Sequence, residues 1–131
     1  MELTCKILKE SKTVAVVGIS DKMERDSGRI AELLQRKGYN VVGVHPVLKN
    51  VFGIPVYASL KEIPFPVDLV DVFLNSDKVP MIMDDVLAIK PKYLWFQLGV
   101  INDEAASLAE QNGIPTVQNR CVAIELNYCG N

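Results

Sequence analysis

The chain has 131 residues, of which 49% are hydrophobic and 23% are charged. This length suits one compact domain with its own core and disfavours a second domain that would carry catalysis, so we expect a single domain over residues 1–131. The 14 basic and 16 acidic residues give a net charge of -2, which argues against binding to nucleic acid or to an anionic membrane.

Cysteine usage and the N-terminal residues bear on the cellular compartment. Cys5, Cys121 and Cys129 are an odd number without CxxC spacing, so the sequence predicts neither a disulfide framework nor a zinc site. The start of the chain lacks the pattern of a signal peptide, and no apolar run approaches about 18 residues. We therefore expect a protein of the cytoplasm that neither crosses nor binds a membrane.

Short apolar runs rich in valine alternate with stretches in which apolar residues recur at helical spacing. The runs have the length and branching of buried parallel strands, and five of them are strong enough to count as main strands. In chain order, the expected elements are a short helix over 2–10, a strand over 14–17, a helix ending before Gly38, a strand over 41–44, a crossover over 47–66 with one minor strand near Val56, a strand over 69–74, a helix ending before Pro91, a strand over 93–96, a helix ending before Gly113, and a strand over 114–117.

The three long helices carry their own boundary signals. Ser27 is expected to cap the first, either Ser76 or Asn75 the second, and Asn102 the third. Pro80 fits the opening turn of the second helix. The glycines that follow the first and third helices fit left-handed helix ends.

Strands that alternate with helices in this way form right-handed βαβ units. The sequence therefore predicts the α/β class, as a doubly wound, Rossmann-like domain of three layers with a mostly parallel five-stranded sheet. In such sheets the ligand crevice lies outside the carboxyl ends of the strands. The residues that follow each strand are thus the candidates for a site.

The loop after the first strand opens a helix and has features of a phosphate site. A glycine lets the backbone turn and approach a ligand, and a helix start presents free N–H groups. However, Ser20 stands where the second glycine of the dinucleotide fingerprint would be, so an ordinary loop with a turn glycine is the alternative. The candidates here are Gly18, Ile19, Ser20, Lys22, Arg25, Ser27 and Gly28, with Arg29 as a further basic side chain near phosphate.

His45 and Pro46 follow the second strand. A nicotinamide-binding domain normally has an acidic residue there to hold the ribose, and its absence counts against NAD. His45 is the single histidine of the chain, so either it faces a ligand or it simply ends the strand in a turn.

The third and fourth main strands end in candidate walls of a nucleotide crevice. Phe73, Leu74 and Asn75 lead into a helix start at Val79, a surface on which a base or ribose can rest, although the Phe73 ring itself is expected in the core. The fourth strand leads to Gln97 and Gly99, which are candidate contacts, and its tryptophan is expected to be buried or at an interface.

Cys121 lies beside an arginine, which can lower the pKa of a thiol. A buried structural thiol is the favoured alternative, because no second histidine or nearby cysteine completes a catalytic set. We therefore assign no catalytic residue and no metal ligand.

Taken together, the strand ends resemble a known family, the stand-alone CoA-binding proteins, which are similar to the N-terminal CoA-binding domain of the succinyl-CoA ligase alpha subunit. The resemblance covers residues 12 to 126 and implies that the Gly18 loop and the helix start near Ser27 hold the CoA pyrophosphate. It also implies that the segments around His45 and at 73–75 and 97–99 line the rest of the cleft. The family usually has asparagine where His45 stands and often proline where Val122 stands. The matching pieces are 17–20, 44–46, 66–73, 94–102 and 119–121.

The leading hypothesis is that the chain binds coenzyme A or an acyl-CoA as a carrier, sensor or regulatory protein. In the ligase a histidine of a second domain carries phosphate and a partner subunit binds nucleotide, so the resemblance implies binding and not ligase activity. The rivals are a small thiol-dependent or nucleotide-dependent oxidoreductase that uses Cys121, and an interaction module without a ligand. The expected partners are the small molecule CoA and, in addition, a second copy of the chain in a homodimer.

Overall fold

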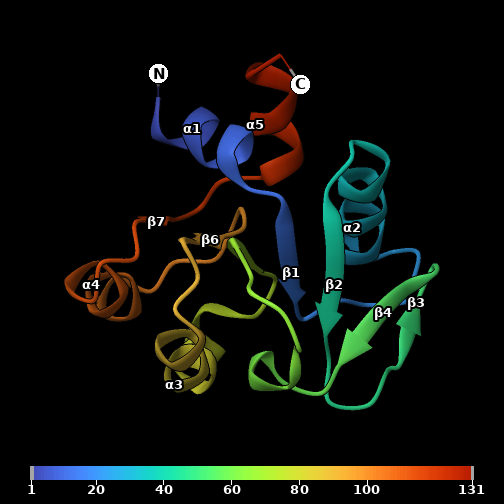
Figure 1. The fold of residues 1–131 in the computed structure, drawn as a ribbon, viewed down its shortest axis with the longest axis horizontal. Coiled ribbons are helices and arrows are strands. Elements are labelled where there is room, and N and C mark those ends of the chain that lie inside the picture. Colours follow the sequence, from blue (N-terminus) through green and yellow to red (C-terminus); the bar gives the residue numbers. More distant parts are fainter. Residues whose placement is uncertain (1, 131) are drawn as a thin grey trace.

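The computed structural model describes residues 2–130 as three layers, with helices on both faces of a seven-stranded sheet (Figure 1). The strands lie in the order β3-β4-β2-β1-β5-β6-β7. The strands are β1 Thr13–Val17, β2 Asn40–Val44, β3 Asn50–Val51, β4 Ile54–Tyr57, β5 Leu69–Val72, β6 Tyr93–Phe96 and β7 Thr116–Val117. The helices are α1 Leu3–Glu10, α2 Asp26–Arg36, α3 Pro80–Ile89, α4 Asp103–Gln111 and α5 Val122–Tyr128, with short 3-10 turns η1 Leu60–Glu62 and η2 Ser76–Lys78.

The Rossmann-like fold is confirmed, and so is the minor strand near Val56, which is β4, but the sheet has seven strands where five main strands were expected. β3 and β4 form an antiparallel hairpin in the crossover, whereas every other strand pairing of residues 2–130 is parallel. The turn between them places Phe52 and Gly53 at positive φ, 52° and 86°. A two-residue hairpin of this kind normally shows Asn or Asp before the glycine, so the phenylalanine conceals it.

The helix boundaries follow some of the expected signals and depart from others. The Oδ1 atom of Asn102 accepts a hydrogen bond from the Ala105 N–H at 3.0 Å, so the predicted cap of α4 is confirmed. Pro80 begins α3 as predicted, but neither Ser76 nor Asn75 caps it with a side chain. The Ser27 cap is also wrong, because α2 begins at Asp26, and Ser27 is buried inside its first turn.

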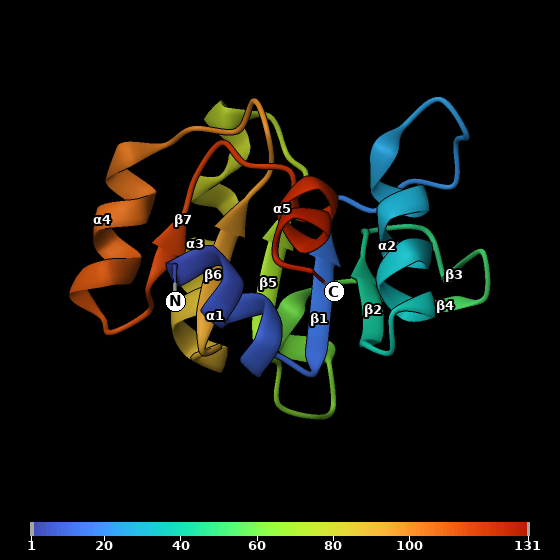
Figure 2. The same ribbon diagram turned by 90° about the horizontal axis from the view of Figure 1, so that it is seen from above.

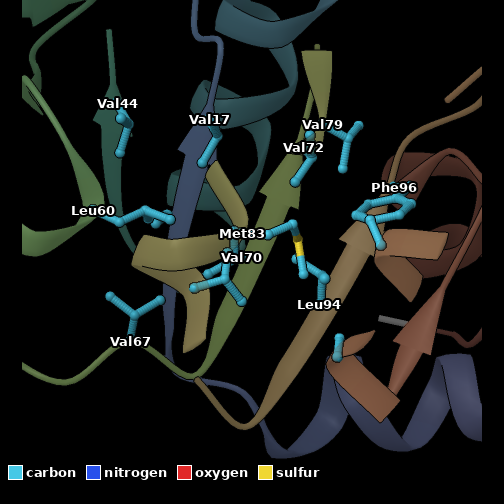
Figure 3. Packing of buried hydrophobic residues seen from close by; sticks show 14 of the residues in the cluster. Val17, Val44, Leu60, Val67, Val70, Val72, Val79, Met83, Leu94 and Phe96 are labelled. Carbon is cyan, nitrogen blue, oxygen red and sulfur yellow. The ribbon is translucent and has the colours of Figure 1, made fainter. Parts of the chain in front are cut away.

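The two faces of the sheet bury separate apolar clusters. Val14, Val16 and Leu69 pack with residues of α1, α2 and α5 on one face. Val17 and Val70 pack on the other face with residues of α3 and α4, around Met83, Leu94 and Phe96 (Figure 3). Trp95 is fully buried, as expected. Alternation along valine-rich strands thus fixes the three layers.

The two ends of the chain are linked through α1 and α5, which lie side by side on one face of the sheet (Figures 1 and 2). Cys5 and Cys129 form a disulfide across a sequence separation of 124 residues. The expectation that the cysteines stay unpaired is therefore wrong. Spacing could not reveal this pair, because only the fold brings α1 and α5 together. Within residues 2–130, no helix is long and apolar enough to span a membrane.

Candidate functional site

A cavity of about 980 Å³ opens at the carboxyl ends of β1, β2, β4 and β5. It lies where the strand order reverses, since the chain leaves β1 for β2 on one side and later adds β5 on the other. Two helices bound it. We define the α2 wall as Ser20, Lys22, Arg25 and Ser27, and the α3 wall as Leu74, Lys78, Met81 and Ile82; all eight residues line the cavity.

Gly18 brings the backbone to the floor of the cavity. Its φ is 84°, and a Cβ atom there would lie 2.8 Å from the carbonyl oxygen of Phe73. The next residue, Ile19, is fully buried, and a Cβ at Gly43 would lie 2.7 Å from its side chain. Two glycines therefore let β1 and β2 approach the loop and the end of β5 closely.

The loop that follows is folded back on itself and on α2. Ser20 Oγ accepts a hydrogen bond from the Lys22 N–H at 3.1 Å. Gly28 does not line the cavity; a Cβ there would contact the Ser20 carbonyl oxygen and would lie 2.8 Å from the Phe52 ring. Gly28 thus allows the first turn of α2 to pack against the loop.

Charges on the α2 wall are divided between paired and unpaired groups. Arg29 binds the Asp26 carboxylate at 2.5 Å and also contacts the Met23 carbonyl, and it does not line the cavity. Lys22 and Arg25 line the cavity and form no ion pair within residues 2–130. Of the three basic candidates, these two are available to a phosphate.

His45 lines the cavity and at the same time ends β2 in a turn. Its Nδ1 atom accepts hydrogen bonds from the N–H groups of Val47 at 3.0 Å and Leu48 at 3.1 Å. An asparagine side-chain oxygen makes the same kind of contact in an Asx turn. Histidine can therefore form this turn at position 45, where we expected the family to have asparagine. With Nδ1 accepting, the neutral ring carries its proton on Nε2 and is left with one donor. Pro46 follows on the rim of the same cavity.

The third strand exit supplies the other wall. Phe73 packs against the cluster on the α1 face and still lines the cavity, together with Leu74 and Asn75. Sequence reasoning missed Lys78, although it directly follows this exit. It also missed Met81, Ile82 and Asp85 of α3, because helical spacing predicts a helix but not that one side of it adjoins a cavity. Ser59 and Leu60 of the crossover line the cavity too and were not predicted.

Besides Gly28 and Arg29, three further candidates lie outside this cavity. Val79 is fully buried in the core. Gln97 is buried, and its Oε1 atom accepts a hydrogen bond from the Val122 N–H at 2.9 Å. The Gly99 N–H donates to Asn119 Oδ1 at 2.7 Å. These contacts hold the exits of β6 and β7 together, so a direct contact of these residues with a ligand stays a prediction.

Cys121 is half-buried at the start of α5 and is not part of the cavity lining. Among residues 2–130, no group of three or more His, Cys, Asp or Glu side chains is placed to hold a metal ion.

Comparison with known families identifies the chain. The family described as CoA binding domain matches residues 12–127, nearly the whole length. The chain belongs to this family. Its match includes both walls of the cavity and every strand.

Some proteins similar to this chain match it over nearly its whole length. Uncharacterized protein YneT of Bacillus subtilis is 33% identical over 119 residues, which cover 91% of this chain and 88% of that protein. The solved structure of a hypothetical protein from Pyrococcus horikoshii OT3 has a TM-score of 0.93 at 31% identity and covers 98% of this chain and 90% of that chain. The family thus includes small proteins of one domain.

A longer enzyme contains a more distant match. Acetate–CoA ligase (ADP-forming) I of Archaeoglobus fulgidus is 24% identical over 123 residues. These cover 86% of this chain but only 18% of the ligase.

Proposed function

We propose that this protein binds coenzyme A or an acyl-CoA in the cavity between the α2 wall and the α3 wall, as a carrier, sensor or regulatory protein. The observation that carries the proposal is the convergence of three phosphate-binding features at one place. They are the close backbone at Gly18, the start of α2, and the unpaired side chains of Lys22 and Arg25.

The start of α2 suits the pyrophosphate. The first N–H groups of a helix have no partner within the helix and carry a partial positive charge. Asp26 in this turn opposes an anion, but its carboxylate is bound by Arg29 at 2.5 Å. Because the net charge of the chain is -2, affinity for phosphate must come from this local arrangement rather than from a positive field of the whole molecule.

The ligase match gives no ground for assigning a ligase reaction to this chain, because the aligned region is only 18% of that enzyme. The rival oxidoreductase would use Cys121, which lies outside the cavity. Turnover of CoA disulfides that disappears in Cys121→Ser would favour that rival. Mass spectrometry of gently denatured protein separates both ideas from an interaction module, which would copurify with no ligand.

Calorimetry tests the proposal directly. We expect CoA to bind more tightly than ATP or NADH, and failure of CoA to bind at millimolar concentration would refute the proposal. Gly18→Ala is expected to lower affinity at least about 10-fold, because the new Cβ displaces the backbone near the phosphate. Gly38→Ala is the matched control: its φ is also positive, at 102°, but a Cβ there meets no atom within 4 Å. Equal affinity of the two variants for CoA would show that the binding site does not include the Gly18 loop.

A cytoplasmic location and pairing into a homodimer are further parts of the proposal. In a reducing cytoplasm the Cys5–Cys129 disulfide would be open, so the redox state of these two thiols reports on the compartment. Thiol alkylation in intact cells followed by mass spectrometry tests the location, and analytical ultracentrifugation tests the dimer.

A further inference from the structure

The α3 wall carries a positive charge that faces the same cavity as the phosphate site on the α2 wall. Lys78 closes the short turn η2, is exposed and lines the cavity. Its ammonium group forms no ion pair within residues 2–130. The cavity therefore has cationic groups on two opposite walls.

The backbone at Lys78 is held in place from behind. The Lys78 N–H donates to the Asn75 carbonyl oxygen at 2.9 Å. Ser76 Oγ accepts a hydrogen bond from the Ile101 N–H at 2.9 Å, and Asn102 Nδ2 donates to the Ser76 carbonyl oxygen at 3.0 Å. The turn is thus fixed to the loop between β6 and α4, while the long side chain of Lys78 stays free to reach a ligand.

The acidic groups around the cavity do not cancel this charge. Asp85, on the same helix, lies 3.8 Å from the ammonium group of Lys61. Asp21 and Glu24 are exposed and belong to the loop before α2, on the opposite side. An anionic group of a ligand on the α3 side would therefore meet Lys78.

The neighbours of Lys78 on this wall are apolar. Leu74, Met81 and Ile82 line the cavity, and the Met81 side chain is 79% exposed although it is apolar. The flat face of an aromatic base would cover this surface, and a phosphate on the attached ribose would pair with the cation beside it.

We propose that Lys78 binds the 3′-phosphate of CoA, with the adenine resting on Leu74, Met81 and Ile82, and so selects CoA over dephospho-CoA and ADP. This inference rests on the proposed function. It assigns the pyrophosphate to the α2 wall and the 3′-phosphoadenosine end to the α3 wall. Lys78 is a specificity-determining residue because it contacts the 3′-phosphate, which dephospho-CoA lacks, and not the pyrophosphate, which both molecules carry.

Calorimetry with two ligands and three variants tests the assignment. We expect wild-type protein to bind CoA about 10-fold more tightly than dephospho-CoA, the effect of one exposed charged hydrogen bond. Lys78→Met is expected to lose this preference through weaker binding of CoA, with unchanged binding of dephospho-CoA. Lys22→Met is expected to weaken both ligands equally. Lys90→Met, at the other end of α3 and outside the cavity, removes the same charge and should change neither affinity.

The outcomes separate this inference from the proposed function. If Lys78→Met weakens the binding of both ligands equally, or of neither, Lys78 does not bind the 3′-phosphate, and the proposed binding of CoA is unaffected. If neither ligand binds to wild-type protein, the proposed function itself fails. Circular dichroism melting of each variant excludes loss of folding as the cause.

Discussion

Asp71 is a charged residue type at the centre of the sheet. It is fully buried on β5, and neither carboxylate oxygen has a hydrogen-bond partner. Its neighbours in register are Val16 on β1 and Trp95 on β6. Burial without a partner raises the pKa of Asp71 well above its ordinary value of 3.8. The sequence did not reveal this unpaired carboxyl, because residue spacing does not show whether a side chain on a strand has a hydrogen-bond partner.

Asp71 is expected to make the free energy of unfolding depend on pH. The folded chain keeps a proton on this carboxyl that the unfolded chain has already lost, so stability is fully present below pH 3.8 and falls as the pH rises through the folded pKa. Asp71→Asn removes this titration. Urea unfolding from about pH 4 to about pH 8 should therefore show the variant gaining on wild type by more than about 1 kcal/mol. A constant difference would contradict the burial of a neutral carboxyl.

Asp68 is the matched control and has the opposite sign. Burial alone would raise the pKa of its carboxyl, but the N–H groups of Thr13 and Lys12 and the ammonium groups of Lys92 and Lys12 lower it. Its contribution is present above the ordinary value of 3.8 and is lost as the pH falls through the folded pKa. Asp68→Asn should thus lose stability at neutral pH and regain parity with wild type in acid.

At the scale of elements, the sequence predicted those whose signal is local. The short apolar runs identified the strands at 13–17, 40–44, 69–72 and 93–96, because strands buried on both faces consist mainly of apolar residues. The minor strand expected near Val56 is β4, but its partner β3 and the helix α5 were missed, since a two-residue strand and a seven-residue helix have too few residues to show periodicity. Among the residues that line the cavity, those at strand exits, such as Gly18, were predicted because parallel sheets place ligands there. Met81 was not predicted, because it lies inside a helix.

Asn102 joins α4 to the turn η2 and is half-buried, so its substitution is expected to be costly. Its Oδ1 caps α4 at Ala105 and its Nδ2 binds the Ser76 carbonyl. We expect Asn102→Ala to lower the free energy of unfolding by about 1–2 kcal/mol in urea denaturation. Asn112→Ala is the control at the other end of α4, where the Nδ2 atom makes one bond, to the Leu108 carbonyl at 2.8 Å. Equal losses would show that the cap has no special weight.

At the scale of the whole molecule, the disulfide restricts the unfolded chain more than the folded one. Closing a loop of 124 residues between Cys5 and Cys129 is expected to stabilise the fold by about 4–5 kcal/mol on chain-entropy grounds. Thermal melting with and without a thiol reductant measures this, and Cys5→Ser should reproduce the reduced value. Cys121→Ser, which leaves the bond intact, should keep its sensitivity to the reductant. A melting temperature that ignores the reductant would show that the bond does not form.

The same bond closes the chain between Cys5 and Cys129 into a covalent ring. The loop between β1 and α2 is exposed from Asp21 to Asp26 and is the natural place for a protease to cut. One cut there opens the ring but releases nothing. The product would gain only the mass of one water and would run as a single band on a denaturing gel, separating into two pieces only when a thiol is added. Breakage beside the cavity would thus leave the molecule covalently whole.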